Sequence, residues 1–210
     1  YFKSLNAPPN IYPLFDSREI DLSHAENFLG RDEIIKEIFA AWKINKHPLL
    51  IGDPGVGKTT IIELIIQRIA AGIIPGFETK VAFLGSAAQV MAPNLMGPPH
   101  LERMVKAILP FKDNVVLALD EFHVLTTNKT SSTYVRTMLD GSSGSIRYGL
   151  FATTKEDYEK SIQTDESLCR RLKVIDVKAL SKNSLLHLLH REIKLANPYM
   201  DATAEAIERI

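Results

Sequence analysis

The sequence predicts an α/β fold in which helices cover both faces of a five-stranded parallel sheet. Three observations carry this prediction. Short apolar runs alternate along the chain with longer stretches whose apolar residues recur at helical spacing. Several of the short runs are apolar without interruption, which is typical of strands buried on both faces of a parallel sheet. A glycine-rich turn joins the first of these runs to a helix, as in phosphate-binding α/β domains.

The predicted elements follow in regular order. Residues 1–24 contain Pro8, Pro9 and Pro13 and show no sustained period, so we expect an extended lead-in. A helix should begin near Asp32 and Glu33, which favour a helix start, and carry Ile35, Ile38, Phe39 and Trp42 on one face. Five strands are expected, at residues 48–52, 80–85, 114–120, 146–153 and 172–177. Further helices are expected at residues 58–71 and near residues 100–109, 131–140 and 155–163.

The composition is that of a soluble globular protein, with 45% hydrophobic and 24% charged residues. Lys and Arg number 25, as do Asp and Glu, and no basic block is present, so a nucleic-acid partner is not expected. No apolar stretch approaches the roughly 20 residues that span a bilayer, so no membrane partner is expected either. The only cysteine, Cys169, cannot form an internal disulfide, which suits the cytoplasm or an organellar matrix or stroma. Because the chain begins at Tyr1 rather than Met, we expect a fragment of a longer protein.

A phosphate-binding motif lies between Gly52 and Thr60, where the chain reads Gly-Asp-Pro-Gly-Val-Gly-Lys-Thr-Thr. The glycines lack side chains, so backbone N–H groups can turn toward phosphates at the positive end of the following helix. Lys58 is expected to neutralise the β- and γ-phosphates, and the Thr59 hydroxyl to reach Mg²⁺. The expected ligands are therefore a nucleotide with β- and γ-phosphates and Mg²⁺. The predicted loop contacts are Asp53, Pro54, Gly55, Val56, Gly57, Lys58, Thr59 and Thr60.

Two adjacent carboxylates, Asp120 and Glu121, follow the third predicted strand. That position lies at the carboxyl end of the sheet, where open α/β folds bind their ligands. Asp120 is expected to hold Mg²⁺, directly or through water. Glu121 is expected to polarise the attacking water, because in-line attack on a γ-phosphate needs an acceptor about 3 Å from that water.

The fourth strand ends in Thr153-Thr154, and the pair Arg170-Arg171 precedes the fifth strand. A hydroxyl at the end of a central strand can hydrogen-bond the γ-phosphate or the attacking water. An arginine supplied by a neighbouring subunit can neutralise charge on the transferring phosphoryl group, an effect worth roughly 10³ to 10⁵ in rate.

With these motifs in place, the chain resembles the AAA+ ATPases and, within them, the first nucleotide-binding module of the Clp ATPases, the ring unfoldases and disaggregases. Two stretches, ATTKEDY at 152–158 and DESLCRR at 165–171, are similar to the Clp pattern Ala-Thr-Thr-x-x-x-Tyr…Asp-x-x-Leu-x-Arg-Arg in residue type and spacing. The resemblance covers about residues 14–210. The stretches that carry it are FLGRDE at 28–33, GDPGVGKT at 52–59, QRIAAGIIP at 67–75, LDEFHVL at 119–125, ATTKEDY at 152–158 and DESLCRR at 165–171.

The resemblance implies an AAA+ α/β nucleotide-binding domain at residues 25–178 and the truncated start of a helical lid at residues 179–210. It implies that Thr154 is the polar sensor and that Arg170 and Arg171 act in trans. Phe28, Leu29, Gly30 and Arg31 would form a wall of the adenine pocket. The implied activity is ATP hydrolysis at the interfaces of a homo-oligomer, a hexameric ring, coupled to the remodelling of unfolded or aggregated proteins.

One stretch departs from the Clp pattern. In the loop that should grip polypeptide, Leu95 stands where an aromatic residue is expected, and Asn94 stands where a cation is expected. Pro98 and Pro99 would stiffen this loop, and an aliphatic side chain gives up the flat ring that wedges against backbone. Two alternatives therefore stay open: an AAA+ scaffold or regulator that assembles on another complex without threading, and a nucleic-acid-acting AAA+ protein, against which the neutral charge argues.

Overall fold

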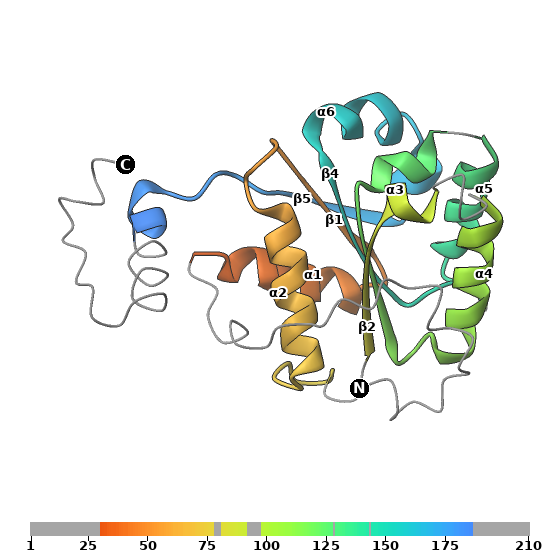
Figure 1. Cartoon of the computed structure of the whole chain (residues 1–210), viewed down its shortest axis with the longest axis horizontal. Helices are drawn as coiled ribbons and strands as arrows, with labels where there is room; N and C mark the ends of the chain where they lie inside the picture. Colours follow the sequence, from red (N-terminus) through yellow and green to blue (C-terminus); the bar gives the residue numbers. More distant parts are fainter. Residues whose placement is uncertain (1–29, 78–80, 92–97, 128, 143, 187–210) are drawn as a thin grey trace.

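Five parallel strands form one sheet in the spatial order β2-β3-β4-β1-β5 (Figure 1). This computed structural model describes residues 30–186 apart from 78–80, 92–97, 128 and 143. All five strands lie within two residues of their predicted positions, so the predicted α/β fold is confirmed. The strands are β1 His47–Gly52, β2 Val81–Ser86, β3 Val115–Asp120, β4 Tyr148–Thr154 and β5 Leu172–Asp176.

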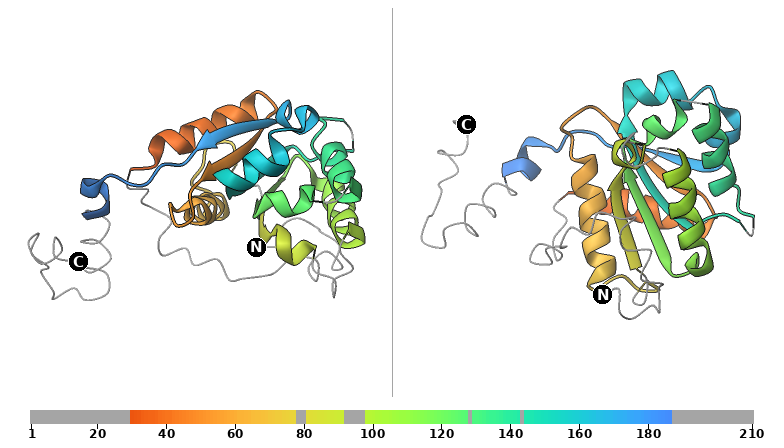
Figure 2. Two further views of the ribbon diagram at one scale, coloured as in Figure 1. Left: turned by 90° about the horizontal axis from the view of Figure 1, so that it is seen from above. Right: turned by 45° about the vertical axis from the view of Figure 1, so that its right-hand side comes forward.

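Helices cover both faces of the sheet, which gives three layers (Figure 2). On one face, α1 (Asp32–Lys43) and α2 (Lys58–Ala70) pack against Leu50, Val116 and Ala118. On the other face, Leu49, Leu117 and Leu119 contact residues of α3 (Ala87–Val90), α4 (Pro98–Ile108) and α5 (Lys129–Met138). Successive residues of each strand thus enter opposite cores, as the period of a strand requires.

The helix α1 shows why these elements form where they do. Asp32 and Glu33 lie in its first turn and Lys43 in its last, so their charges complement the helix dipole. Ile35, Ile38 and Trp42 form its buried stripe. The helix ends as Asn45 takes a left-handed conformation, with φ of 54°, and the chain turns into β1.

Several short elements fall between the main helices and strands. A 3₁₀ turn at Leu109–Phe111 follows α4, and α6 (Lys155–Asp157) continues into a π-helical turn, η6 (Tyr158–Ile162), inside the predicted helix at 155–163. The helix α3, the 3₁₀ turn η5 (Phe122–Thr126) and the helix α7 (Glu166–Cys169) were not predicted. Each is too short to show a hydrophobic period. Local capping fixes α7, whose Asp165 carboxylate accepts a hydrogen bond from Leu168 N at 3.1 Å.

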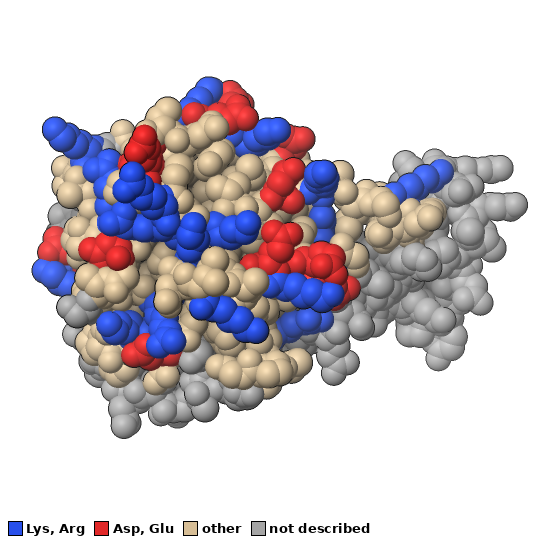
Figure 3. All heavy atoms as spheres, turned by 180° about the vertical axis from the view of Figure 1, so that it is seen from behind, with Lys and Arg blue, Asp and Glu red and all other residues tan. Residues whose placement is uncertain are grey.

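Parts of the prediction lie outside the described residues: the lead-in, Phe28 and Leu29, Asn94 and Leu95, and residues 187–210 of the expected lid. Pro98 and Pro99, which were expected to stiffen the loop, instead begin α4, where the missing N–H of a proline costs no helical hydrogen bond. Residues 182–186 are helical, where a helix was expected. No helix in the described part of the chain is long and apolar enough to cross a membrane. On the face seen in Figure 3, basic and acidic side chains are interspersed.

Candidate nucleotide site

The phosphate loop connects β1 to α2 at the carboxyl edge of the sheet. Gly55 and Gly57 have φ of +80° and +92°, a region that residues with a Cβ avoid. Gly52 is required for a different reason: a Cβ there would lie 2.4 Å from the carbonyl oxygen of Val177. The loop therefore depends on its glycines both for its own turn and for its contact with the segment after β5.

Lys58 is the cation of the loop, and its side chain is buried. Its Nζ donates hydrogen bonds to the carbonyl oxygens of Gly52 and Asp53, both at 2.9 Å. Burial lowers the pKa of Lys58, and the carboxylates of Asp120 and Asp53 partly offset that effect. The ammonium group is therefore held at the mouth of the loop, where phosphate oxygens would replace backbone carbonyls as its partners.

Thr59 and Asp120, the two predicted metal ligands, are hydrogen-bonded to each other. The Thr59 hydroxyl donates to Oδ2 of Asp120 at 2.5 Å. A hydroxyl and a carboxylate are hard oxygen ligands of the kind that Mg²⁺ prefers, with water and phosphate oxygens completing its octahedron. The described residues contain no cluster of three or more His, Cys, Asp or Glu that could hold a metal alone. The pair thus fits a metal that arrives with a nucleotide.

Glu121 lies at the edge of the same site in a strained conformation, with φ of 54°. Its N–H donates to Oδ1 of Asp120 at 2.8 Å, and its Oε2 accepts a hydrogen bond from the Ser86 hydroxyl at 2.7 Å. Ser86 ends β2 and lies opposite Asp120 in the strand register. Sequence reasoning missed Ser86 because the predicted strand stopped at Gly85. The signal available was a polar residue at the end of a strand that neighbours β3.

Thr154 ends β4 directly opposite Gly52, so it lies beside the start of the phosphate loop. Its hydroxyl donates to the Asp157 carboxylate at 2.5 Å and accepts from Asp157 N at 3.1 Å, which caps α6. The neighbouring Thr153 is buried, and its Oγ1 lies 3.0 Å from Nδ1 of His123. His123, which sequence reasoning did not single out, therefore links the turn after Glu121 to the end of β4.

Arg170 and Arg171 do not reach the phosphate loop of this chain. His47 N, at the amino end of β1, donates to the carbonyl oxygen of Arg171 at 2.9 Å. The phosphate loop begins at the opposite end of β1, roughly 16 Å away at the rise of a strand. The two side chains also differ. Arg170 is exposed and pairs with the similarly exposed Glu166 at 3.3 Å, whereas Arg171 turns back onto Ser167, whose hydroxyl accepts from Nη1 at 2.8 Å.

Arg31 ties the loop to the segment that follows β5. Its Nη2 donates to the carbonyl oxygen of Val56 and its Nη1 to that of Lys178, each at 2.7 Å. Gly30, with φ of 77°, lies close to Leu180 and Ser184. Of the residues expected to line the adenine pocket, Gly30 and Arg31 are therefore near both the phosphate loop and the start of the expected lid.

Comparison with known proteins gives consistent matches. Residues 48–175 match the family described as "ATPase family associated with various cellular activities (AAA)". The chain is 28% identical over 202 residues to chaperone protein ClpB 2 of Parasynechococcus marenigrum strain WH8102. The matched region covers 91% of this chain and 22% of that protein. It is 34% identical over 161 residues to chaperone protein ClpB of Clostridium tetani, covering 70% of this chain and 18% of that protein. The chain thus spans about a fifth of the length of these relatives.

Solved structures give the same result. A closed-state structure of Hsp104 with ATPγS and FITC-casein superposes with a TM-score of 0.65 at 28% identity, covering 80% of this chain and 30% of that one. The Hsp104–ADP complex of S. cerevisiae gives 0.65 at 27% identity, covering 81% of this chain and 25% of that one.

Proposed function

The chain belongs to the AAA family of ATPases, and on that premise we propose that it hydrolyses MgATP at the subunit interfaces of a hexameric ring and uses the energy to remodel proteins. Membership makes the chain a nucleotide-binding ATP hydrolase of the Clp chaperone type. The ring, the metal and the protein substrate are the proposed parts. The observation that carries the proposal is that Lys58, Thr59, Asp120 and Glu121 converge on one phosphate loop.

Hydrolysis needs three functions, which we assign to residues of this site. Lys58 would bind the β- and γ-phosphates, since it is the cation at the mouth of the loop. Thr59 and Asp120 would hold Mg²⁺, which neutralises charge on the phosphates when it is bound. Glu121 would take the proton of the attacking water. The hydrogen bond from Ser86 to Oε2 holds the Glu121 carboxylate in place and leaves acceptor sites on the group for water.

The position of the arginine pair supports catalysis between subunits. Arg170 is exposed and lies at the amino edge of the sheet, farther from its own phosphate loop than an arginine side chain can reach. It can therefore neutralise phosphoryl charge only in a neighbouring copy. Arg170 pairs with Glu166 in an exposed ion pair that a ligand can replace at little cost, whereas Arg171 makes a part-buried hydrogen bond to Ser167. We therefore assign the trans-acting role first to Arg170, while Thr154, at the end of β4 beside the loop, would sense the bound phosphate.

The experiment that tests this proposal mixes two variants of the full-length protein. One carries Arg170→Ala with Arg171→Ala, and the other carries Glu121→Gln. Each alone should bind ATP and hydrolyse it poorly, because no interface combines an intact Glu121 with intact arginines. Mixed rings should recover part of the activity. Co-assembly without recovery, or full activity of the double-arginine variant alone, would contradict catalysis at an interface.

A second function is favoured by one sequence feature, the replacement of the expected aromatic residue by Leu95 in the substrate loop. A scaffold or regulator would bind and hydrolyse ATP without threading polypeptide. ATPase rates measured with unfolded casein, with single-stranded DNA and with neither would separate the candidates. Stimulation by casein alone supports remodelling, stimulation by DNA alone supports action on nucleic acid, and no stimulation supports the scaffold.

A further inference from the structure

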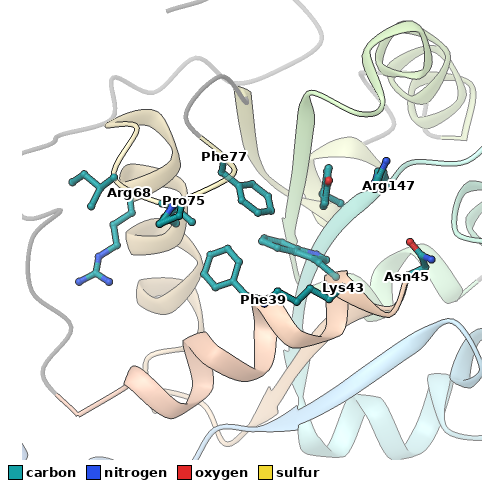
Figure 4. Close-up of a pocket in the computed structure, with 11 residues that line it drawn as sticks. Phe39, Lys43, Asn45, Arg68, Pro75, Phe77 and Arg147 are labelled. Carbon is teal, nitrogen blue, oxygen red and sulfur yellow. The ribbon is translucent and has the colours of Figure 1, made fainter.

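A cavity of about 600 Å³ lies at the amino edge of the sheet, between the C-terminal ends of α1 and α2 and the start of β4 (Figure 4). Its volume falls within the range of ligand-binding pockets. It is separate from the nucleotide site, because Tyr148 begins β4 whereas Thr154 ends it beside the phosphate loop. No role assigned above uses this cavity.

Four aromatic rings line the cavity and form what we call its floor: Phe39 and Trp42 of α1, Phe77 before β2, and Tyr148 of β4. Phe77 is at the centre of this group: its ring centroid lies 5.4 Å from that of Phe39, 5.2 Å from that of Trp42 and 5.1 Å from that of Tyr148. The indole N–H of Trp42 donates to the carbonyl oxygen of Gly149 at 2.9 Å, which fixes its ring. The floor is therefore preformed, and an apolar side chain could enter without ordering it first.

The rim of the cavity is basic. Lys43, Arg68 and Arg147 belong to its lining, and the lining residues that the structure describes, which exclude 78–80, include no Asp or Glu. Arg147 packs over the ring of Tyr148 at 5.4 Å and pairs with Asp113 at 2.9 Å, outside the lining. A negatively charged occupant would therefore meet cations around the opening and no carboxylate among the lining residues.

Apolar surface continues beyond the rim. Three large hydrophobic side chains are exposed in the described part of the chain: Ile44 at 63%, Ile73 at 51% and Leu185 at 46%. Ile73 lines the cavity, and Ile44 lies between the lining residues Lys43 and Asn45. Two of the three thus gather at one opening, which is typical of a surface that contacts another protein.

We propose that this cavity docks a short segment of a partner protein in which an aromatic or large aliphatic side chain is flanked by Asp and Glu. The apolar side chain packs onto the aromatic rings from the cavity, and the exposed isoleucines cover its neighbours. The flanking carboxylates pair with the basic rim. A peptide suits the site better than a small molecule, because the exposed side chains of Ile73 and Ile44 add apolar surface to that of the aromatic rings.

Trp42 supplies a direct reporter, because it is the only tryptophan of the chain and lines the cavity. The probe is an acetylated peptide with Phe-Leu at its centre and three acidic residues on each side. Titration should give a saturable change in tryptophan fluorescence, with a dissociation constant below about 100 µM at low salt and weaker binding at high salt. Peptides with Ala-Ala at the centre, or with lysines in place of the acids, should bind at least roughly tenfold more weakly.

Two rim variants localise the binding. Ile73→Asp and Lys43→Glu change exposed side chains, so the fold should persist. Each variant should bind the acidic peptide roughly tenfold or more weakly than the parent does. Leu185→Asp and Lys129→Glu are matched controls, because they make the same changes at exposed positions outside the cavity lining. They should leave the affinity unchanged.

Several results would overturn the proposal. The first is a titration without a saturable response. The second is a lysine or alanine peptide that binds as tightly as the acidic peptide. The third is an affinity for the acidic peptide that is the same in the rim variants as in their controls. Indole that binds as tightly as the peptide would indicate a small-molecule pocket instead. A dimer of this chain that forms in sedimentation experiments and is abolished by Ile73→Asp would assign the surface to a second copy.

Discussion

At the carboxyl edge of the sheet, the side chains of Thr59, Ser86 and Glu121 make their hydrogen bonds in exposed positions. At the amino edge, Trp42 and His47 are buried, and both bond to the backbone of Gly149. An exposed polar group can exchange its partner for a ligand at little cost, whereas a buried one that loses its partner pays the full cost of desolvation. Changes to the exposed groups at the carboxyl edge should therefore alter chemistry, and changes to the buried Trp42 and His47 at the amino edge should alter stability.

The largest expected effect is on turnover at the carboxyl edge. Glu121→Gln should lower the ATPase rate by roughly 10² to 10⁴, because the amide keeps the shape of the side chain but cannot accept a proton. Affinity for ATP should stay within a few-fold of the parent. Steady-state ATPase assays and nucleotide titrations of the full-length protein measure both. Glu159→Gln, an exposed acid on η6, is the matched control. A rate close to the parent's would remove Glu121 from its assigned role.

The next effect is on binding. Lys58→Ala should weaken the binding of ATP by about 100-fold or more, because the substitution removes charge-assisted hydrogen bonds to the phosphates. Lys155→Ala removes an exposed cation from the start of α6 and should leave affinity nearly unchanged. Titration with a fluorescent ATP analogue measures both, and the fluorescence of Trp42 should confirm that the amino edge is intact. Equal affinity in the two variants would contradict the assignment of the phosphate site.

At the amino edge, His47 should make stability depend on pH. Burial lowers its pKa from 6.5 to about 4, although a hydrogen bond with the Leu139 backbone partly opposes the shift. Between these values the unfolded chain binds a proton that the folded chain does not, so the free energy of unfolding falls as pH decreases from about 6.5 to 4. The total loss is about 3 kcal/mol.

Urea unfolding at several pH values tests this effect. In His47→Asn, the free energy of unfolding should fall less than in the parent as the pH decreases from about 6.5 to 4. The other histidines contribute equally to both proteins. Parallel curves for the two proteins would show that His47 is not the group responsible.

The smallest effect should follow from Trp42→Phe. The substitution removes the indole N–H and leaves the buried carbonyl oxygen of Gly149 without its donor, at a cost of about 1–3 kcal/mol in the free energy of unfolding. Thermal or urea unfolding followed by circular dichroism measures the loss. Affinity for ATP should not change. A variant that is fully stable but binds ATP poorly would break the contrast between the two edges.

The sequence by itself determined the sheet, the phosphate loop and the acidic pair, because each is encoded locally. An apolar run, a glycine pattern or two adjacent carboxylates can be read without knowing which strands are neighbours. In the folded sheet, Thr59 and Asp120 lie at the same edge and are hydrogen-bonded to each other. A Mg²⁺ site shared by these two residues requires this proximity.

Only the tertiary structure decided the partners of these residues. Ser86 reaches Glu121, and His123 reaches Thr153, through the register of strands that are distant in sequence. The separation of Arg170 from its own phosphate loop likewise follows from the pairing of β5 with β1. The amino-edge cavity draws its rings from the helix α1, the segment before β2 and the strand β4, so no single stretch of sequence carries its signal. Contacts between distant segments depend on packing and register, which local patterns of residues do not specify.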